Sequence, residues 1–473
     1  MTIGHSILSR KMRSKQSLAG LTGKIIFGFV LILFLISRVY KIAEIPVSVY
    51  WDEASIGYNA YSIATDLKDE WGDKLPLHFR AFGEFKLPVY IYTVAIFVKA
   101  LGLNEYAVRL PAVLYSLGTL IVVYLLMKKI TGKEWTGILA SFILSFSPWF
   151  FIFSRTGYEA TAGLFFFLLG TYLFLLLDKG RIYVLGAILS FVLSFYSYNS
   201  FRIIIPIWLV LLLIYKFHEF KKIRKYLLVL ILSAVLFLIS LIPVYRLYKY
   251  DAGGVRFAQV EVTSKLDFVK NYFSHFDPNF LFLKGDTNPR SQIPGHGQLY
   301  LFEIPLIILG LIAIFKSKKI LYFLPLATLL IAPIPAALTK ESPHALRALL
   351  MAPSFAMISA MGALFLREHV KKIGSIILFV VIVAYYLSFE SYLIDFITKY
   401  SAETASDWQY QYKEIFAKQK NGIVTDKYAQ PYIFALYYLK YPPEKFRQEV
   451  KLNPVSDWGF SKVASFGEFK FKK

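Results

Sequence analysis

The stretch Val49-Tyr50-Trp51-Asp52-Glu53-Ala54 follows an apolar run over residues 24–40 that is long enough to cross a membrane. The carboxylates of Asp52 and Glu53 therefore fall at the edge of a lipid bilayer. Carboxylates at that depth are costly, and they are usually kept for chemistry or ion handling. The pair also fits the cap and acidic first turn of a helix, which the helix dipole favours. The rest of the chain has to separate these two interpretations.

The composition indicates a polytopic α-helical membrane protein. Of 473 residues, 56% are hydrophobic, and the mean hydropathy is +0.52. Apolar runs with their flanks reach the roughly 20 residues that span a bilayer, whereas a β-barrel would show short alternating segments. The absence of cysteine excludes disulfides and thiolate chemistry.

The net charge of +22 comes largely from basic connections between apolar runs. Basic loops favour the cytoplasmic side of a membrane, so this pattern is a topology signal and we expect no nucleic-acid partner. The basic connections are 128–133, 179–181, 216–225, 316–319 and 367–372. The N-terminus is also basic, so one early apolar run must fail to cross. We expect residues 88–101 to lie in the outer interface instead.

The predicted protein is a multi-pass plasma-membrane protein with about 11 transmembrane helices plus interfacial helices. Its N-terminus is cytoplasmic, and its C-terminus and polar segments lie on the outer face. Residues 1–397 form an all-α transmembrane domain with a first external loop at 41–105. A second external loop, at 246–299, is long enough to be a functional lid. Residues 398–473 form a small external α/β domain, with helices at 404–420 and 431–440 and a strand at 422–425.

The outer segments contain the residues that are candidates for chemistry. Asp52 is suited to act as a general base if an acceptor hydroxyl lies beside it. Lys86 is suited to hold a phosphate as a point charge, although a lysine there could also snorkel to the membrane surface. The remaining candidates for binding an anion or a sugar are Glu84, Arg155, Tyr158, Glu159, Tyr198, Asn199, Arg202, His344 and Arg347.

Each of these candidates has a structural alternative. Arg155 could pair with Glu159 along a helix or contact lipid headgroups. His344 and Arg347 would share one face if a helix has already begun there, and a lone histidine in this position could be structural. Metal-ligand spacing is lacking among the histidines, so no metal site is assigned. No cofactor is expected, and Mg²⁺ or Mn²⁺ held by Asp52, Glu53 and Glu84 is the alternative.

Several short motifs occur in a characteristic order. Asp52-Glu53 is followed by Phe85-Lys86-Leu87-Pro88, then by Leu101-Gly102-Leu103-Asn104-Glu105 and Arg109-Leu110-Pro111. This order resembles the polyprenyl-phosphate-sugar glycosyltransferases of the GT-C fold. Within them it is most similar to the protein O-mannosyltransferase and lipid A aminoarabinose transferase group, glycosyltransferase family 39. The resemblance is strong over residues 45–130 and diffuse beyond them.

The resemblance implies roles for three residues. Asp52 matches the family's catalytic base, Glu53 its supporting acid, and Lys86 the lysine that binds the donor phosphate. The family often has an arginine two residues after the glutamate and a Lys-Pro-Pro motif, where this chain has Ser55 and Lys86-Leu87-Pro88. Our hypothesis is that Arg202 or Arg347 supplies the missing positive charge.

The sequence thus predicts an inverting glycosyltransferase that moves a sugar from a polyprenyl-phosphate donor to an acceptor hydroxyl on the outer face. The acceptor is unknown and could be a protein, a glycolipid or a polysaccharide. One alternative is a transporter or flippase of lipid-linked glycans, but transporters usually place polar sites between repeats near the bilayer midplane. The other alternative is a non-catalytic subunit that binds a lipid-linked glycan.

Overall fold

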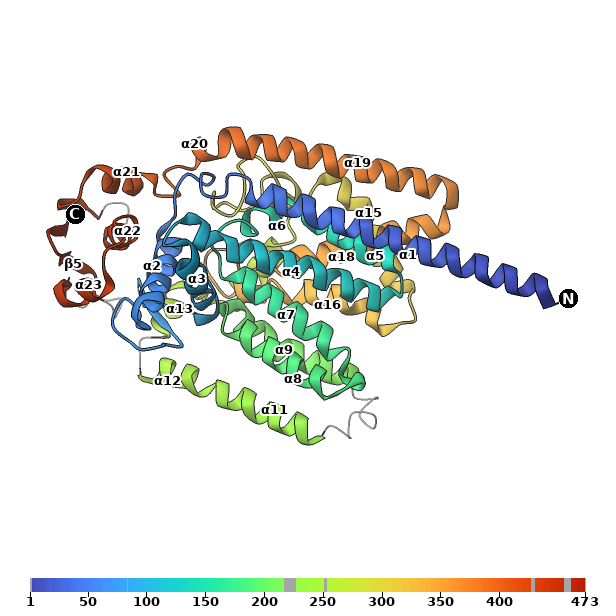
Figure 1. Cartoon of the computed structure of the whole chain (residues 1–473), viewed down its shortest axis with the longest axis horizontal. Helices are drawn as coiled ribbons and strands as arrows, with labels where there is room; N and C mark the ends of the chain where they lie inside the picture. Colours follow the sequence, from blue (N-terminus) through green and yellow to red (C-terminus); the bar gives the residue numbers. More distant parts are fainter. Residues whose placement is uncertain are drawn as a thin grey trace.

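The structure is a computed structural model that describes residues 2–82, 84–216, 227–250, 253–426, 430–454 and 461–472. The basic connection expected at 216–225 lies outside these residues except for Lys216. A bundle of apolar helices forms most of the molecule, and a small domain sits at one end of it (Figure 1). We call this the loop-bearing end, because residues 40–105 and the C-terminal domain gather there.

Most helices of the bundle are joined by short connections, and two longer segments, 40–104 and 251–303, interrupt this order. Among the described residues, five stretches are long and apolar enough to cross a membrane: Leu21–Val39, Glu105–Thr131, Asn199–Lys216, Ile320–Ala337 and Lys372–Glu403. The bundle consists of α1 (Thr2–Val39), α4 (Glu105–Thr131), α5 (Glu134–Phe146), α6 (Pro148–Phe153), α7 (Ala160–Phe174), α8 (Arg181–Phe195), α9 (Asn199–Lys216), α11 (Leu227–Ser240), α12 (Ile242–Tyr250), α15 (Ile304–Lys316), α16 (Leu324–Ile331), α17 (Ile334–Ala337), α18 (Met351–His369) and α19 (Lys371–Asp395).

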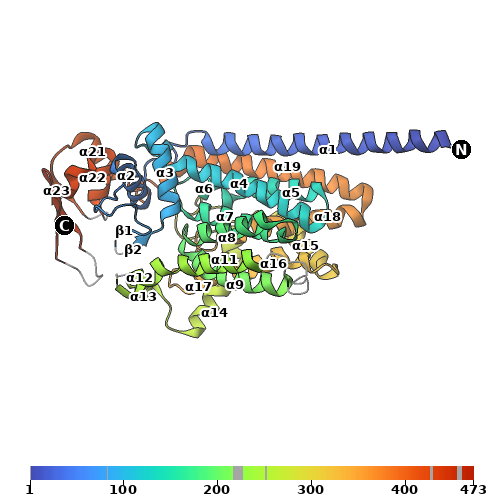
Figure 2. The same ribbon diagram turned by 60° about the horizontal axis from the view of Figure 1, so that its bottom comes forward.

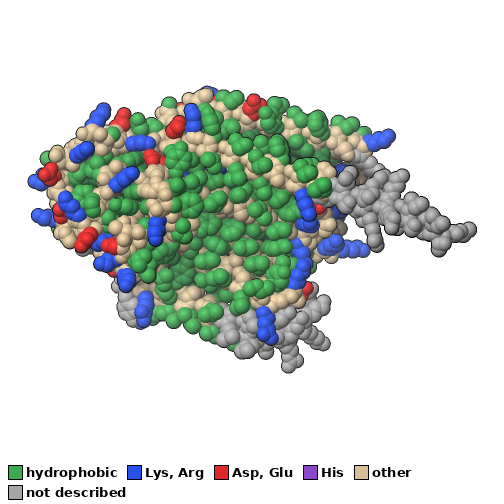
Figure 3. All heavy atoms as spheres, viewed as in Figure 1, with side chains coloured by type: hydrophobic (Ala, Val, Ile, Leu, Met, Phe, Trp, Pro, Cys, Tyr) green, Lys and Arg blue, Asp and Glu red, His purple; other side chains and the backbone are tan. Residues whose placement is uncertain are grey.

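The surface of the bundle is apolar where a soluble protein would be polar. Figure 3 shows a broad hydrophobic surface across the helices, with charged side chains concentrated toward its two ends. On α1, Ile25, Phe29, Ile32 and Ile36 are each more than half exposed. A continuous exposed apolar surface of this extent is stable against lipid rather than water. The chain is therefore a multi-pass membrane protein, as its composition predicts.

Small residues allow the closest approach inside the bundle. A Cβ atom added at Gly310 of α15 would lie 2.1 Å from the carbonyl oxygen of Ile358, and one at Gly362 of α18 would lie 1.9 Å from that of Leu306. Helices in membranes commonly pack through glycine in this way, because the hydrophobic effect does not drive their association there. This contact fixes α15 and α18 against each other below the external loops.

The segment 41–105, which the sequence predicts as the first external loop, folds into compact elements at the loop-bearing end. It contains α2 (Trp51–Asp66), an antiparallel hairpin of β1 (Phe79–Ala81) and β2 (Glu84–Lys86), and α3 (Pro88–Leu101). The helix predicted after Asp52-Glu53 is α2. The segment 88–101 is a separate short helix that lies beside α2 and α4 (Figures 1 and 2). Its proposed position in the outer interface stays a prediction.

The C-terminal region contains the small α/β domain that the sequence predicts. A four-stranded sheet has the order β3-β6-β5-β4, in which β3 pairs with β6 in parallel and the other pairs are antiparallel. The predicted strand is β3, and the two predicted helices are shorter than expected. The elements are α20 (Ser401–Glu403), α21 (Tyr410–Lys418), β3 (Gly422–Thr425), α22 (Pro431–Tyr438), α23 (Pro443–Glu449), β4 (Lys451–Leu452), β5 (Val463–Phe466) and β6 (Phe469–Lys472).

This domain packs directly on α2. A Cβ atom at Gly57 would lie 2.7 Å from the ring of Tyr437, so the two helices meet where α2 has no side chain. Arg447 donates hydrogen bonds to the Ser62 hydroxyl at 3.0 Å and to the Asp66 carboxylate. These contacts hold α2, and with it Asp52, between the domain and the bundle.

Candidate active site

Asp52 occupies the first turn of α2 without capping it. The residue before the helix is Tyr50, and its side chain makes no capping hydrogen bond. The Oδ2 atom of Asp52 accepts a hydrogen bond from the Trp51 indole at 3.1 Å. Its Oδ1 atom lies 2.5 Å from the Nζ atom of Lys86. The side chain is 24% exposed, so the carboxylate is both paired and accessible.

Lys86 reaches Asp52 from the hairpin, 34 residues later in the chain. Its side chain is only 3% exposed, and its Nζ atom also lies 3.4 Å from Glu84 Oε1. Burial by itself lowers the pKa of this ammonium group, but the carboxylates of Asp52, Glu84 and Glu159 outweigh burial and raise the pKa above its ordinary value. Lys86 is therefore a fixed positive charge among three carboxylates, and its snorkelling alternative does not fit this burial.

Glu53, one residue after Asp52, points into the protein interior. It forms a bidentate ion pair with Arg109 of α4, with Nε–Oε1 and Nη2–Oε2 distances of 3.0 and 2.9 Å, and both side chains are fully buried. The Gly157 backbone N–H donates to Oε1 at 2.6 Å. Arg109 also donates to the carbonyl oxygens of Ile42, Pro46 and Ser48. This pair joins α2, α4 and two connecting segments, and it separates Glu53 from the accessible carboxylate of Asp52.

Arg155 has a similar connecting position. It donates to the carbonyl oxygens of Ser37, Tyr40 and Ile45, at 3.1, 3.0 and 3.0 Å, and it lies 4.4 Å from the Phe396 ring centroid. The side chain is buried, which leaves no surface for lipid headgroups, and no ion pair with Glu159 is found among the described residues. Arg155 instead satisfies carbonyl groups in the last turn of α1 and in the segment that follows it, where a helix end leaves carbonyls unpaired.

Two tyrosine side chains, Tyr50 and Tyr158, lie near Asp52. The rings of Tyr50 and Tyr158 are 5.3 Å apart, and Tyr158 is buried. Glu159 follows at the start of α7 and is close enough to Lys86 to raise its pKa. Tyr198 lies in the connection before α9 and is partly buried. The structure thus brings Tyr158 and Glu159 to the same region as Asp52 and Lys86.

Arg290 is a further cation in this region that the sequence interpretation did not select. It lies 5.2 Å from the Tyr50 ring centroid and donates to the Asp407 carbonyl oxygen at 3.0 Å. Burial lowers its pKa, but Tyr158, Tyr50 and Asp52 outweigh this and raise it. The only sequence signal was a cation after Asn288-Pro289 in the long loop, and such a signal is not specific.

His344 and Arg347 lie in an irregular segment and the turn that follows it, rather than on one helical face. Helix α18 begins later, at Met351, so the shared face considered from their spacing does not form. The His344 backbone N–H donates to His275 Nε2 at 3.1 Å. Its ring Nδ1 lies 3.9 Å from Asp286 Oδ2 and has no hydrogen-bond partner. Arg347 donates to Thr339 Oγ1 at 2.7 Å and lies 3.3 Å from the exposed Glu341 carboxylate.

Arg202 and Asn199 are placed at the start of α9. Arg202 Nη2 lies 2.9 Å from His78 Nε2, which precedes the hairpin that carries Lys86. The guanidinium also lies 5.4 Å from the Phe195 ring centroid. Asn199 is exposed. These contacts place Arg202 beside the first external loop, but no contact of Arg202 with Lys86 or Asp52 is found among the described residues.

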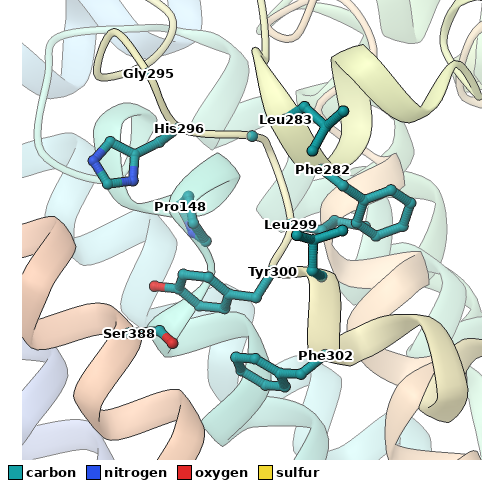
Figure 4. Close-up of a pocket in the computed structure, with 11 residues that line it drawn as sticks. Pro148, Phe282, Leu283, Gly295, His296, Leu299, Tyr300, Phe302 and Ser388 are labelled. Atoms are coloured by element: carbon teal, nitrogen blue, oxygen red, sulfur yellow. The ribbon is translucent and has the colours of Figure 1, made fainter.

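A separate cavity of about 280 Å³ opens between residues 282–302, α6 and α19 (Figure 4). Its lining includes the apolar side chains of Phe282, Leu283, Leu299, Leu301 and Phe302 and the polar groups of His296, Tyr300 and Ser388. His296 pairs with Asp395 at 3.0 Å on its rim. None of the candidate site residues lines this cavity.

Across the residues that the structure describes, no group of three histidine, aspartate or glutamate side chains is arranged to hold a metal ion. Asp52 and Glu84 both approach Lys86, whereas Glu53 is occupied by Arg109. Asp52, Glu53 and Glu84, which the sequence suggested as ligands of Mg²⁺ or Mn²⁺, therefore do not face a common point.

Comparison with known proteins decides the fold. Residues 86–244 match the family described as dolichyl-phosphate-mannose-protein mannosyltransferase. ArnT from Cupriavidus metallidurans in the apo state superposes with a TM-score of 0.56 at 9% identity, over 90% of this chain and 85% of that chain. The chain has the fold of the GT-C glycosyltransferases, and the family match over residues 86–244 supports a glycosyltransferase.

Two further structures share the GT-C fold. ArnT from the same organism bound to undecaprenyl phosphate gives a TM-score of 0.53 at 10% identity, over 88% of this chain and 74% of that chain. The Archaeoglobus fulgidus oligosaccharyltransferase in complex with Zn and sulfate gives 0.53 at 16% identity, over 87% of this chain and 61% of that chain. No curated protein sequence matches this chain significantly.

Proposed function

We propose that this GT-C glycosyltransferase transfers a sugar from a polyprenyl-phosphate donor to an acceptor hydroxyl, with inversion at the anomeric carbon. The observation that carries the proposal is the pairing of an accessible carboxylate, Asp52, with a buried lysine, Lys86, at 2.5 Å. A carboxylate can take the acceptor proton, and an ammonium group can hold the phosphate that leaves. The donor class is also consistent with the ArnT structure that holds undecaprenyl phosphate.

In this mechanism Asp52 acts as the general base. The acceptor oxygen attacks the anomeric carbon as its proton moves to an Asp52 oxygen, and the bond between the anomeric carbon and the phosphate oxygen breaks. Polyprenyl phosphate leaves with the bonding electron pair. Because there is a single displacement, the configuration at the anomeric carbon inverts.

The ion pair between Lys86 and Asp52 gives the mechanism an order of events. Without donor, Lys86 holds the Asp52 carboxylate in an ion pair. When a donor phosphate takes a position beside Lys86, the ammonium group gains a second anionic partner and its hold on Asp52 weakens. Binding of the donor would therefore free an Asp52 oxygen to accept the proton of the acceptor hydroxyl.

Arg290 would add positive charge on the other side of Asp52. Negative charge develops on the phosphate as the sugar departs, so a fixed cation stabilises the transition state more than the ground state. Arg202 and Arg347 remain proposed contributors to the same charge. Tyr158, Tyr198, Glu159, Asn199 and His344 are proposed to position donor or acceptor. Glu84 is proposed to hold Lys86.

Glu53 and Arg155 are proposed to act on the site through position rather than through substrate contact. The Glu53–Arg109 pair holds the first turn of α2, and Arg155 holds the chain around residues 37–45. Glu53 would therefore support Asp52 by fixing the helix that carries it. This gives a structural meaning to the supporting role that the family resemblance implies for Glu53.

We propose that the site faces the outer side of the plasma membrane, with the N-terminus in the cytoplasm. The alternation of basic connections supports this orientation. The acceptor class is left open among protein, glycolipid and polysaccharide. We propose no cofactor, because cationic side chains of the protein would bind the donor phosphate. If transfer stops in EDTA and returns with Mg²⁺ or Mn²⁺, a metal-dependent mechanism would replace this proposal.

The proposal is tested with purified protein in vesicles that contain a polyprenyl-phosphate sugar labelled in the sugar. Mass spectrometry of the polyprenyl phosphates that copurify with the protein first identifies the sugar. We expect the label to leave the lipid for an acceptor hydroxyl, or for water in slow hydrolysis. Movement of the intact labelled lipid between leaflets without cleavage would support a flippase. Binding with neither cleavage nor movement would support a non-catalytic subunit.

A further inference from the structure

Helix α14 (Lys265–Ser274) exposes an apolar stripe that the proposed chemistry does not use. The helix begins after Ser264, whose hydroxyl accepts a hydrogen bond from the Leu266 backbone N–H. Leu266, Val269 and Phe273 are 75%, 47% and 63% exposed. Their spacing places them on one side of the helix. Exposed apolar residues that cluster in this way mark a contact surface.

The other side of α14 is attached to a membrane-spanning stretch. Asn271 donates to the Thr339 carbonyl oxygen at 2.9 Å, and the Tyr272 hydroxyl donates to the Leu330 carbonyl oxygen at 2.7 Å. Leu330 belongs to the candidate span Ile320–Ala337 and is itself 47% exposed. The stripe therefore lies beside a surface that faces lipid. Figure 2 shows α14 projecting sideways from the bundle next to α17 at the loop-bearing end.

The charges of α14 fit the same environment. Lys265 and Lys270 are exposed near the stripe, and Asp267 is exposed on a different side of the helix. Lysines at a membrane surface keep their ammonium groups at the level of lipid phosphates while their apolar stems contact the membrane. We propose that α14 is an interfacial anchor that inserts Leu266, Val269 and Phe273 into the boundary of the leaflet at the loop-bearing end.

The anchor is connected to the candidate active site by hydrogen bonds. His275 directly follows α14, and its Nε2 atom accepts from the His344 backbone N–H at 3.1 Å. The next residue, Ala345, donates from its backbone to Asp286 Oδ2 at 2.7 Å. Attachment of α14 to the bilayer thus holds the segments that carry Arg347 and Arg290. This consequence rests on the proposed function, whereas the anchoring itself does not.

Anchoring can be measured directly because the chain has no cysteine. Full-length Phe273→Cys protein is labelled with the fluorophore NBD and reconstituted into vesicles of phosphatidylcholine and phosphatidylglycerol, with and without doxyl-labelled lipid. Asp267→Cys protein, labelled on another side of the same helix, is the matched control. We expect a blue-shifted emission at position 273 and roughly twofold or more stronger quenching by doxyl lipid than at position 267.

Equal quenching at the two positions would overturn the anchor. Disulfide-linked dimers of unlabelled Phe273→Cys protein in vesicles, without lipid quenching, would assign the stripe to a contact between copies instead. The link to the site is measured separately with the double variant Leu266→Asp, Phe273→Asp, in which we expect transfer to fall while Asp267→Asn protein keeps it. Unchanged transfer in the double variant would show that anchoring of α14 does not affect the active site. Absence of transfer in the unmodified protein would contradict the proposed function but not the anchoring of α14.

Discussion

The Nζ atom of Lys86 lies 2.5 Å from the Oδ1 atom of Asp52, although the two residues are 34 positions apart and belong to a hairpin and a helix. The hairpin register pairs Phe79 with Lys86, and α2 is held by the C-terminal domain. Two separately supported elements therefore meet at one ion pair.

Asp52→Asn should abolish transfer while donor binding is retained. The amide has nearly the same size but cannot accept the acceptor proton, and general bases typically contribute about 10²–10⁴-fold to a rate. Turnover of labelled donor and retention of polyprenyl phosphate during purification are measured on the same sample. Asp267→Asn, an exposed acid on α14, is the control. Near-normal turnover of the Asp52 variant would remove the base assignment.

Lys86→Ala should weaken the use of donor. Loss of a charge that stabilises the departing phosphate would cost on the order of 2–4 kcal/mol of barrier, which appears as a fall in kcat/KM. Lys86→Arg should restore part of this loss, since the positive charge is kept. Lys99→Ala, which changes an exposed lysine of α3, should behave as the unmodified protein. A donor titration that is identical for Lys86→Ala and its control would reject the phosphate role.

Glu53→Gln should destabilise the protein more than it affects the chemistry. The substitution leaves the Arg109 guanidinium buried without its counter-charge, and breaking a buried pair in this way costs about 3–5 kcal/mol. Thermal unfolding in detergent measures the loss, and the double variant with Arg109→Gln should recover part of it because the unpaired charge is gone. A Glu53→Gln protein that melts normally but has lost transfer would instead place Glu53 in the chemistry.

Arg290→Ala should lower kcat with little change in folding. Its guanidinium lies at the Tyr50 ring and influences the same region as Asp52, so we expect it to act on charge that develops during transfer. Lys284→Ala, an exposed lysine in the same loop, is the matched control. Single-turnover measurements with bound donor separate this effect from binding. If the two variants have equal kcat, Arg290 has no part in catalysis.

The buried carboxyl group of Glu70, in the segment 41–105, should make the free energy of unfolding depend on pH. Burial raises the pKa of its carboxyl group to about 8, so the folded protein holds this proton more tightly than the unfolded chain does. Stability should therefore decrease as pH rises from the ordinary glutamate range toward 8. Glu70→Gln should reduce this decrease, and Asp69, whose pKa burial raises to about 6, accounts for part of what remains. Melting temperatures of both proteins across this range provide the measurement, and parallel curves would contradict the prediction.

The sequence by itself determined the membrane class, the helix that begins near Asp52 and the two charged residues at the centre of the proposed site. These features depend on local properties: hydropathy over a span, helix periodicity after residue 52, and a lysine before a proline at a helix start. The strand at 422–425 was also predictable, because alternation and turn residues are local signals.

Only the tertiary structure decided what the neighbouring charges do. Asp52 and Glu53 are adjacent in sequence, yet successive positions of a helix point about 100° apart, so one carboxylate meets Lys86 and the other meets buried Arg109. Arg155 is bonded to carbonyl oxygens more than 100 residues earlier, and Arg290 lies against Tyr50 from a distant loop. Such pairings depend on how the helices pack against one another, and no spacing along the chain contains that information.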